Sequence, residues 1–465
     1  MRPFSMRDKL GYTLGDLGCC CTEQFRAMYL SVFYTLILQV NPFHIGILML
    51  ITKIWDAVND PIIGAIVDSR KATKGGKFIP WIRAFSFPMA VLCILGFVNV
   101  SNLAYGLRLA YMFVTYVLYE ALYTCVNVPF GTLSSVMTDD VRHRTALSRY
   151  RSLGGTIFMT VIVMVGPLVL YVDNKPVAGR FLMLASVFAL IGLLCLQITC
   201  VWCKERVAVP ERPKGEKLNY LHVIKEIAKN KALLGVMFFS LVGMIGASVV
   251  NGLNTYLFKD YFGNVKIMAV SGGLSVLYSL ITFAITQPLA DKLGKKEWCC
   301  WGAGFAAAVF ALLFFFPIHN PVLFIVINGV CYLGASGMQV LIWAMVNDSI
   351  DYHELQTGER NEGIVYSTYS FFHKLASAVS GSLSSFVLGF IGYNVAEGAV
   401  QTAEVSNAIW KSYTGIYVLG YGVAVAILFF VYPLTKAKTT EMLEQLKARR
   451  AEKASAVETD GEQCP

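Results

Sequence analysis

Long apolar runs separated by short polar segments dominate the chain. A helix that crosses the hydrocarbon core of a membrane needs about 20 mostly apolar residues, and runs of this length are too numerous here to be core helices of a soluble domain. We therefore predict an all-α integral membrane protein with twelve spans, at residues 10–38, 43–67, 80–100, 105–136, 153–172, 181–202, 233–257, 268–291, 298–317, 321–347, 364–393 and 410–434.

The longest polar interruption falls between the sixth and seventh predicted spans. It is basic and contains two prolines, which is typical of a linker. We divide the chain into an amino-terminal six-helix half (1–202), a cytoplasmic middle loop (203–232), a carboxy-terminal six-helix half (233–435) and a cytoplasmic tail (436–465). The tail opens with a charge-mixed helical stretch, and we expect its polar end to be disordered.

Composition and charge agree with this topology. Hydrophobic residues make up 56% of the chain and charged residues 15%, whereas soluble domains have about 25% charged residues. On the twelve-span topology, most of the 39 basic residues fall on the side of the termini, and the exceptions in loops of the opposite side are Arg108, Lys175, Arg180, Lys259, Lys266 and Lys411. Because basic loops remain cytoplasmic, we expect a cell (inner or plasma) membrane protein with both termini in the cytoplasm. The net charge of +9 then favours contact with anionic lipid rather than nucleic acid.

A short motif recurs in both halves. Asp68 precedes a Gly-Gly-Lys segment at 75–77, and Asp291 precedes Gly-Lys-Lys at 294–296. A carboxylate at a helix end can pair with basic residues or with a facing helix N-terminus, and so hold one side of a transporter closed. We predict a gating or structural role for Asp68 and Asp291. The motif resembles the signature loop of the major facilitator superfamily, which implies two pseudo-symmetric halves.

Ionisable residues inside the second predicted span indicate function, because charge is costly within a membrane. Asp56 and Asp60 are four residues apart and share one helical face, which Asn59 adjoins. Their oxygens could bind Na+, and two desolvated carboxylates could equally share a proton. The pattern predicts a cation or proton site. A structural salt bridge of Asp56 with Lys53 or Lys374 is the alternative, although it would require only one acid.

Several motifs, in order along the chain, resemble those of the glycoside–pentoside–hexuronide:cation symporter family, a branch of the major facilitator superfamily. They are Tyr12–Gly18, Trp55–Pro61, Pro80–Trp81, Tyr123–Phe130, Arg144–Arg151, Asp348–Arg360 in the loop after the tenth span, and Glu362–Lys374. The resemblance extends to about residue 435. It implies alternating access that carries a glycoside, pentoside or hexuronide together with Na+, Li+ or H+.

The resemblance also assigns the coupling cation to particular residues. It places the cation at Asp56, Asn59 and Asp60, with Thr124 of the fourth span beside them. Lys374 of the eleventh span would lie between the cation and the sugar, and would balance the carboxylates when no cation is bound. A lysine that snorkels to the membrane surface is the alternative for Lys374.

The sugar site departs from the family's melibiose permease branch. That branch has an aspartate in each of the first and fourth spans, where this chain has Cys20 and Asn127. Asn127 retains a donor and an acceptor for hydroxyl groups, whereas a cysteine hydrogen-bonds weakly. Glu23 and Asp16 lie near the face of Cys20. Gly131 stands at the position of the branch's stacking tryptophan and leaves room there.

The fifth span contributes an arginine to the sugar site by the same resemblance. It corresponds to Arg151 or, with a short gap in the alignment, to Arg149. A guanidinium fork suits vicinal hydroxyls or a uronate carboxylate. Any one of these polar residues could instead make a hydrogen bond between helices. We assign sugar binding to Cys20, Asn127, Arg151, Lys374, Glu120 and Glu23, and a gating or structural role to Asp16.

Other functional classes fit the chain less well. An enzyme is disfavoured because the sequence has no HExxH, GxSxG or glycine-rich phosphate loop. A sensor of sugars would need a signalling domain. An exporter of a different substrate, or a facilitator that needs no cation, remains the alternative. We expect no cofactor besides the coupling cation; the expected partners are a sugar, a monovalent cation and membrane lipid, with no nucleic acid.

Overall fold

The computed structural model of the chain describes residues 3–69, 75–138, 140–207, 230–357, 376, 380, 382–396 and 398–461. Within these ranges the only strands are β1 (Tyr171–Val172) and β2 (Lys175–Pro176), which form an antiparallel hairpin. Asp173 and Asn174 between them have positive φ angles of 47° and 61°, as a two-residue type I′ turn requires. All other regular elements of the described residues are helices, so the predicted all-α class holds apart from this hairpin.

Six helices precede residue 203. They are α1 (Met6–Leu36), α2 (Pro42–Ser69), α3 (Ile79–Leu95), α4 (Tyr105–Met137), α5 (Val141–Leu170) and α6 (Ala178–Trp202). Each corresponds to a predicted span, but α5 begins well before residue 153. The Asp140 side chain accepts a hydrogen bond from the backbone N–H of Arg142 at 2.7 Å and caps this earlier start.

The later helices differ from the prediction in two places. They are α8 (Lys231–Tyr256), continued by the π-helical turn η1 (Leu257–Tyr261), then α9 (Ile267–Leu293), α10 (Lys295–Phe315), α11 (Pro321–Ala335), α12 (Gly337–Thr357), α14 (Ala403–Phe430) and α15 (Lys436–Gly461). The predicted span 321–347 breaks at Ser336, and residues 348–357 are helical rather than a loop. The tail is helical as far as Gly461 because alanine, glutamate and lysine favour helix. Most of the predicted span 364–393 lies outside the described residues. Within its described part, residues 382–390 are helical.

Eight helical segments of the described chain are long and apolar enough to cross a membrane. They are Tyr105–Met137, Ala146–Leu170, Ala178–Trp202, Lys231–Tyr261, Ile267–Leu293, Lys295–Phe315, Pro321–Gln356 and Ala403–Phe430. Helix α3 is apolar but shorter. Helices α1 and α2 are long enough, but charged and polar side chains interrupt their apolar runs. Such a set of helices is characteristic of a multi-pass membrane protein.

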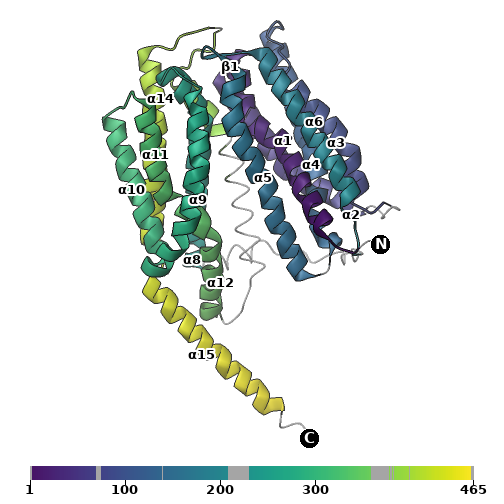
Figure 1. Cartoon of the computed structure of the whole chain (residues 1–465). Coiled ribbons are helices and arrows are strands. Elements are labelled where there is room, and N and C mark those ends of the chain that lie inside the picture. Colours follow the sequence, from purple (N-terminus) through teal and green to yellow (C-terminus); the bar gives the residue numbers. More distant parts are fainter. Residues whose placement is uncertain are drawn as a thin grey trace. The chain divides into compact units, whose positions relative to one another are not determined.

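The chain forms two compact units. The first comprises residues 1–213, 251–273 and 381–410. In it α1 packs against α5 and α6, α3 against α4 and α6, and α2 against α4 (Figure 1, purple to blue). The second unit comprises residues 214–250, 274–380 and 411–465. Its apolar core is built from side chains of α8, α10, α12, α14 and α15, and α10 also packs against α11.

Glycines bring α1 close to its neighbours in the first unit. A Cβ atom on Gly18 would lie 2.8 Å from the carbonyl oxygen of Gly192 in α6, and a Cβ on Gly192 would lie 2.8 Å from that of Gly18. On α5, a Cβ on Gly154 would lie 2.5 Å from the carbonyl oxygen of Thr13. Small residues at helix crossings allow such close packing in membranes. The glycines therefore set the position of α1 and of its polar side chains.

Replacing Gly18 with alanine is expected to lower the thermal stability of the protein, because the added methyl group would meet the Gly192 carbonyl. Overpacking of this kind costs about 1–3 kcal/mol. The control Gly106→Ala adds a methyl group in α4 where no neighbouring heavy atom of the described chain lies within 4 Å. Thermal unfolding in detergent compares the two variants. An unchanged midpoint for Gly18→Ala would contradict the tight crossing of α1 and α6.

Candidate functional site

Two carboxylates of α2 meet one hydroxyl of α4. Thr124 Oγ1 lies 3.2 Å from Asp56 Oδ1 and 3.1 Å from Asp60 Oδ1. Thr124 is only 1% exposed, while both aspartates are half-buried. A hydroxyl has a single hydrogen, so Thr124 donates to one carboxylate at a time. The shared helical face predicted for the two acids is thus directed at the threonine that the family resemblance places beside them.

Asn59 adds a buried amide next to this pair. It is 5% exposed, and its Nδ2 atom has no hydrogen-bond partner within the described residues. Carboxylate, hydroxyl and amide groups are hard oxygen donors, which suit ions such as Na+ rather than thiophilic metals. The described residues contain no group of three or more His, Cys, Asp or Glu side chains arranged to hold a metal ion. The candidate cation site is therefore Asp56, Asn59, Asp60 and Thr124.

Four charged side chains form a second group near the cation site, which we name the charge cluster: Glu23 and Arg26 of α1, Lys53 of α2 and Glu120 of α4. Arg26 Nη1 lies 3.6 Å from Glu120 and 4.0 Å from Glu23. Lys53 Nζ lies 3.7 Å from Glu120 and 4.0 Å from Glu23. The side chains of Arg26 and Glu120 are only 3% and 2% exposed. Each of the two bases thus forms ion pairs with both glutamates.

The charge cluster changes the interpretation of three residues. Glu23 and Glu120 were predicted to bind sugar, and the structure places them against two bases. The ion pairs of Lys53 go to these glutamates, whereas Asp56 accepts from Thr124, so the alternative of a simple Asp56–Lys53 bridge is not what the structure shows. Arg26 was not among the residues predicted for the site. Its spacing of three from Glu23, on one face of the first span, was the available signal.

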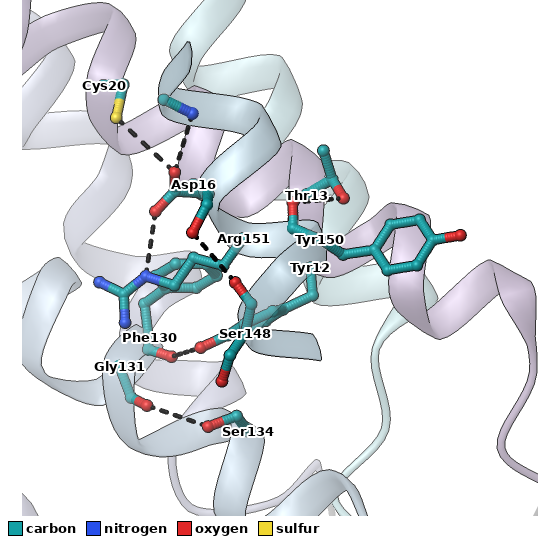
Figure 2. A network of polar contacts seen from close by, with 12 residues as sticks. Tyr12, Thr13, Asp16, Cys20, Phe130, Gly131, Ser134, Ser148, Tyr150 and Arg151 are labelled. Atoms are coloured by element: carbon teal, nitrogen blue, oxygen red, sulfur yellow. Dashed lines mark hydrogen bonds and ion pairs between the residues drawn. The ribbon is translucent and has the colours of Figure 1, made fainter. Parts of the chain in front are cut away.

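Asp16 ties α1 to α5 (Figure 2). Its Oδ1 accepts a hydrogen bond from Arg151 Nε at 3.1 Å, and its Oδ2 accepts one from the backbone N–H of Gly155 at 2.9 Å. The Cys20 thiol lies one turn further along α1, with Sγ 3.8 Å from Asp16 Oδ2. Asp16 therefore supplies a carboxylate one turn before the position where the melibiose permease branch has its aspartate.

The Arg151 side chain stands beside the open position at Gly131. Its guanidinium carbon lies 5.4 Å from the centre of the Phe130 ring, and the side chain is 39% exposed. Among the described residues, a Cβ on Gly131 would have only Arg151 Nη1, at 3.8 Å, as a neighbour within 4 Å. Arg149 is exposed, and the contact with Asp16 is made by Arg151. Asn127 is half-buried on α4, between Thr124 and Gly131 in sequence.

Both copies of the repeated motif contain a glycine with a positive φ angle. Gly76 has a φ angle of 103° and Gly294 one of 112°, a region that favours glycine. Just after α6, the Glu205 carboxylate accepts the backbone N–H groups of residues 77–79 at 2.8–2.9 Å and so caps α3. Asp291 is exposed and accepts a hydrogen bond from Gln287 of its own helix. The side chain of Asp68, like all of Lys374, lies outside the described residues.

Comparison with known proteins gives the class and then the family. The sequence profile of the family described as "MFS/sugar transport protein" matches residues 11–436. The chain is thus a multi-pass membrane transporter rather than an enzyme, and it belongs to this sugar-transport family of the major facilitator superfamily, in its glycoside–pentoside–hexuronide:cation symporter branch.

Relatives from several bacteria align over nearly the whole chain. The uncharacterized symporter YjmB of Bacillus subtilis is 31% identical over 446 residues, which are 95% of each protein. The isoprimeverose transporter of Lactiplantibacillus pentosus is 29% identical and covers 97% of this chain and 93% of its own. The glucuronide carrier protein homolog of Escherichia coli is 25% identical and covers 96% of each.

Solved structures confirm the fold of a major facilitator. The nucleoside transporter NupG has a TM-score of 0.61 at 15% identity and covers 90% of this chain and 98% of its own. A D-xylose–proton symporter has a TM-score of 0.59 at 15% identity and covers 93% of this chain and 98% of its own. Likeness at this level of identity shows the fold alone.

Removing one acid from the charge cluster should destabilise the protein more than removing an acid and a base together. Glu120→Gln leaves two buried bases with one glutamate, and an uncompensated buried charge costs about 3–5 kcal/mol. The double variant Arg26→Gln/Glu120→Gln leaves Lys53 with Glu23 and should unfold at a higher temperature than Glu120→Gln. Thermal unfolding of four proteins, namely the wild type, Arg26→Gln, Glu120→Gln and the double variant, measures this. A double variant as unstable as the sum of its single variants would show that the charges do not interact.

Proposed function

We propose that the protein is a cation-coupled symporter of a glycoside, pentoside or hexuronide. It works by alternating access of two six-helix halves, twelve spans in all, in a cell (inner or plasma) membrane with both termini in the cytoplasm. The observation that carries the coupling is the Thr124 hydroxyl held between Asp56 and Asp60. The family and its relatives named for isoprimeverose and glucuronide support a sugar as the substrate.

The coupling follows from the electrostatics of the α2 pair. Two carboxylates that approach one hydroxyl repel each other, and the repulsion is strong where water is scarce. A bound Na+, Li+ or H+ would relieve it, and Thr124 would complete the set of oxygen ligands around a metal cation. Any rise in sugar affinity caused by the cation must be matched by an equal rise in cation affinity caused by the sugar. This reciprocity makes the two substrates travel together.

We place the sugar at the Asp16–Arg151 pair, next to Asn127 and Gly131. Asp16 holds Arg151 through Nε, and the exposed part of the guanidinium offers charge-assisted hydrogen bonds to sugar hydroxyls or to a uronate carboxylate. Asn127 adds a donor and an acceptor. The missing side chain at Gly131 leaves space for a ring or an aglycone beside the arginine.

Alternating access requires contacts between the halves that can break, and the first unit contains a set of them. Asn174 Nδ2 donates to the carbonyl oxygen of Lys259 at 2.9 Å, and its Oδ1 accepts from the N–H of Val265 at 3.0 Å. These bonds join the loop after α5 to the connection between α8 and α9. With both termini in the cytoplasm, this face is the outer one, and rocking of the halves would open it.

Uptake into reconstituted vesicles tests the substrate and the ion together. Labelled isoprimeverose, a glucuronide, free hexuronates and a nucleoside would be offered under an imposed Na+, Li+ or H+ gradient. We expect accumulation of at least one sugar, driven by one of the ions. Equal uptake with and without every gradient would identify a cation-independent facilitator, and transport of the nucleoside alone would overturn sugar transport.

Removing the α2 carboxylates should separate sugar movement from the ion. In Asp56→Asn/Asp60→Asn we expect gradient-driven accumulation to be lost, because no negative charge remains there to bind the cation, while exchange of labelled for unlabelled sugar continues. Thr124→Val should weaken cation affinity less, since only one neutral ligand is removed. Cation-driven accumulation at the wild-type level in the double variant would refute the proposed site.

The sugar site can be tested with two neighbouring arginines. Arg151→Gln removes the guanidinium beside Gly131, and the loss of charged hydrogen bonds should raise the KM for the transported sugar about tenfold or more. Arg149→Gln removes an exposed arginine two residues away and should leave KM unchanged. Initial uptake rates over a range of sugar concentrations measure both. Equal KM values for the two variants would place the sugar elsewhere.

A further inference from the structure

The charge cluster of Glu23, Arg26, Lys53 and Glu120 has no role in the binding sites proposed above. Burying the charges of Arg26 and Glu120 is expensive, and a packed apolar group of similar volume is often as stable. Charged residues within membrane segments are for this reason usually functional. The charge cluster joins α1, which carries Asp16, to α2 and α4, which carry the proposed cation site, and this connection indicates what that function is.

On one side the charge cluster adjoins the cation site. Lys53 lies three residues before Asp56 on α2, and Glu120 lies four residues before Thr124 on α4, so both groups occupy the same seam between these helices. Lys53 and Asp56 are thus about one turn apart on α2, where their opposite charges attract each other. A cation that binds at Asp56 must therefore change the electrostatic balance of Lys53.

On the other side the charge cluster contains two residues of α1, the helix that carries Asp16. Glu23 and Arg26 follow Asp16 by about two and three turns, and Cys20, whose Sγ lies 3.8 Å from Asp16 Oδ2, stands between Asp16 and Glu23 in the sequence. Asp16 in turn holds Arg151. A displacement of α1 therefore moves Asp16 and Arg151 of the proposed sugar site directly.

The packing of α1 makes such a displacement possible. Helix α1 contacts α5 and α6 along most of its length, but it touches α2 and α4 at few positions. At that sparse interface the charge cluster supplies the ion pairs. Their N···O distances of 3.6–4.0 Å exceed hydrogen-bond length, and Arg26 Nε and Glu23 Oε2 are buried with no hydrogen-bond partner among the described residues. Attraction between charges persists when helices shift by an ångström, whereas a hydrogen bond does not.

We propose that the charge cluster couples the two sites: it transmits binding of a cation at Asp56 and Asp60 to α1, and so positions Asp16 and Arg151 for the sugar. This inference rests on the proposed function. When a cation binds, Asp56 attracts Lys53 less, and Lys53 interacts more strongly with Glu23 and Glu120. Helix α1 is then drawn toward the seam of α2 and α4, together with α5 through the Asp16–Arg151 pair. The four residues are positioning residues, because none needs to touch the cation or the sugar.

Cys20 provides a reporter that belongs to the protein itself. It is half-buried on α1, with Sγ 3.8 Å from Asp16 and a hydrogen bond from Gln24 at 3.4 Å. The rate at which N-ethylmaleimide alkylates Cys20, quantified by mass spectrometry of its peptide, should change when α1 moves. Full-length protein in detergent would be titrated with NaCl, with LiCl and with a pH step. Cation binding would be measured in parallel by calorimetry and by proton uptake.

Two matched variants separate coupling from simple charge balance. Glu23→Gln/Arg26→Gln removes both charges of α1 and leaves the Lys53–Glu120 pair at 3.7 Å. Arg26→Gln/Glu120→Gln also removes one acid and one base, but it leaves Lys53 with Glu23 of α1 at 4.0 Å. Thr115→Val controls for a buried polar change on α4, since the Thr115 hydroxyl donates to carbonyls of its own helix.

We expect the cation to change the alkylation rate of Cys20 about fivefold or more in the wild type, the lower range of typical coupling between sites. In Glu23→Gln/Arg26→Gln the change should vanish while the cation still binds. In Arg26→Gln/Glu120→Gln part of the change in alkylation rate should remain, and in Thr115→Val all of it should remain. If the first double variant does not fold, Arg26→Lys provides the test: its retained charge should preserve the response.

Each contrary outcome has a distinct meaning. A full response in Glu23→Gln/Arg26→Gln, or no response of Cys20 in a wild type that binds the cation, would overturn the coupling role. Loss of cation binding in that variant would also overturn it, because the charge cluster would then be part of the cation site. Loss of the response in Arg26→Lys would show that packing rather than charge matters. Cation binding that survives in Asp56→Asn/Asp60→Asn would instead contradict the proposed function.

Discussion

A charge inside a membrane must be compensated by the protein or by an ion, and the arrangement of the first unit depends on this constraint. Two groups on α1, α2 and α4 meet it in different ways. The charge cluster combines two acids with two bases and is neutral by itself. The α2 pair directs two carboxylates of like charge at one neutral hydroxyl. In the proposed function the cation binds at the α2 pair, and the charge cluster can serve a different purpose.

Much of the candidate site could be predicted from the sequence because helical periodicity is local. The spacing of Asp56 and Asp60 puts them on one face whatever the tertiary structure, and an apolar run of sufficient length predicts a span. Partners across helices depend instead on which faces meet. The pairing of Glu23 and Glu120 with Arg26 and Lys53 requires the packing of three helices, which hydropathy does not encode. Two glutamates assigned to sugar from their helical face alone therefore proved to have bases as neighbours.

Helix ends were the other feature that apolar patterning could not predict. A span is defined by hydrocarbon thickness, whereas a helix continues until its backbone groups find other partners. Helix α5 starts at Val141 because Asp140 caps it, well outside the apolar run. Helix α12 continues to Thr357 through polar residues, and Lys295 of α10 binds Asp348 within it at 2.7 Å. Residues 348–357 of the motif expected in a loop are thus part of a helix, and Asp348 within it faces a base.

The two sites differ in how firmly their helices are joined. Asp16 bonds to a backbone N–H of α5, and glycines on α5 and α6 bring α1 into direct backbone contact, so the register of these helices is rigid. The interface of α1 with α2 and α4 has few contacts. The charge cluster at this interface is held by interactions that weaken only gradually with distance. A protein that must move one site in response to the other needs rigid bodies and a compliant joint between them. Charges at 3.6–4.0 Å attract each other without a fixed geometry, so the charge cluster can act as that joint. An apolar interface of the same size would not respond to the binding of a cation.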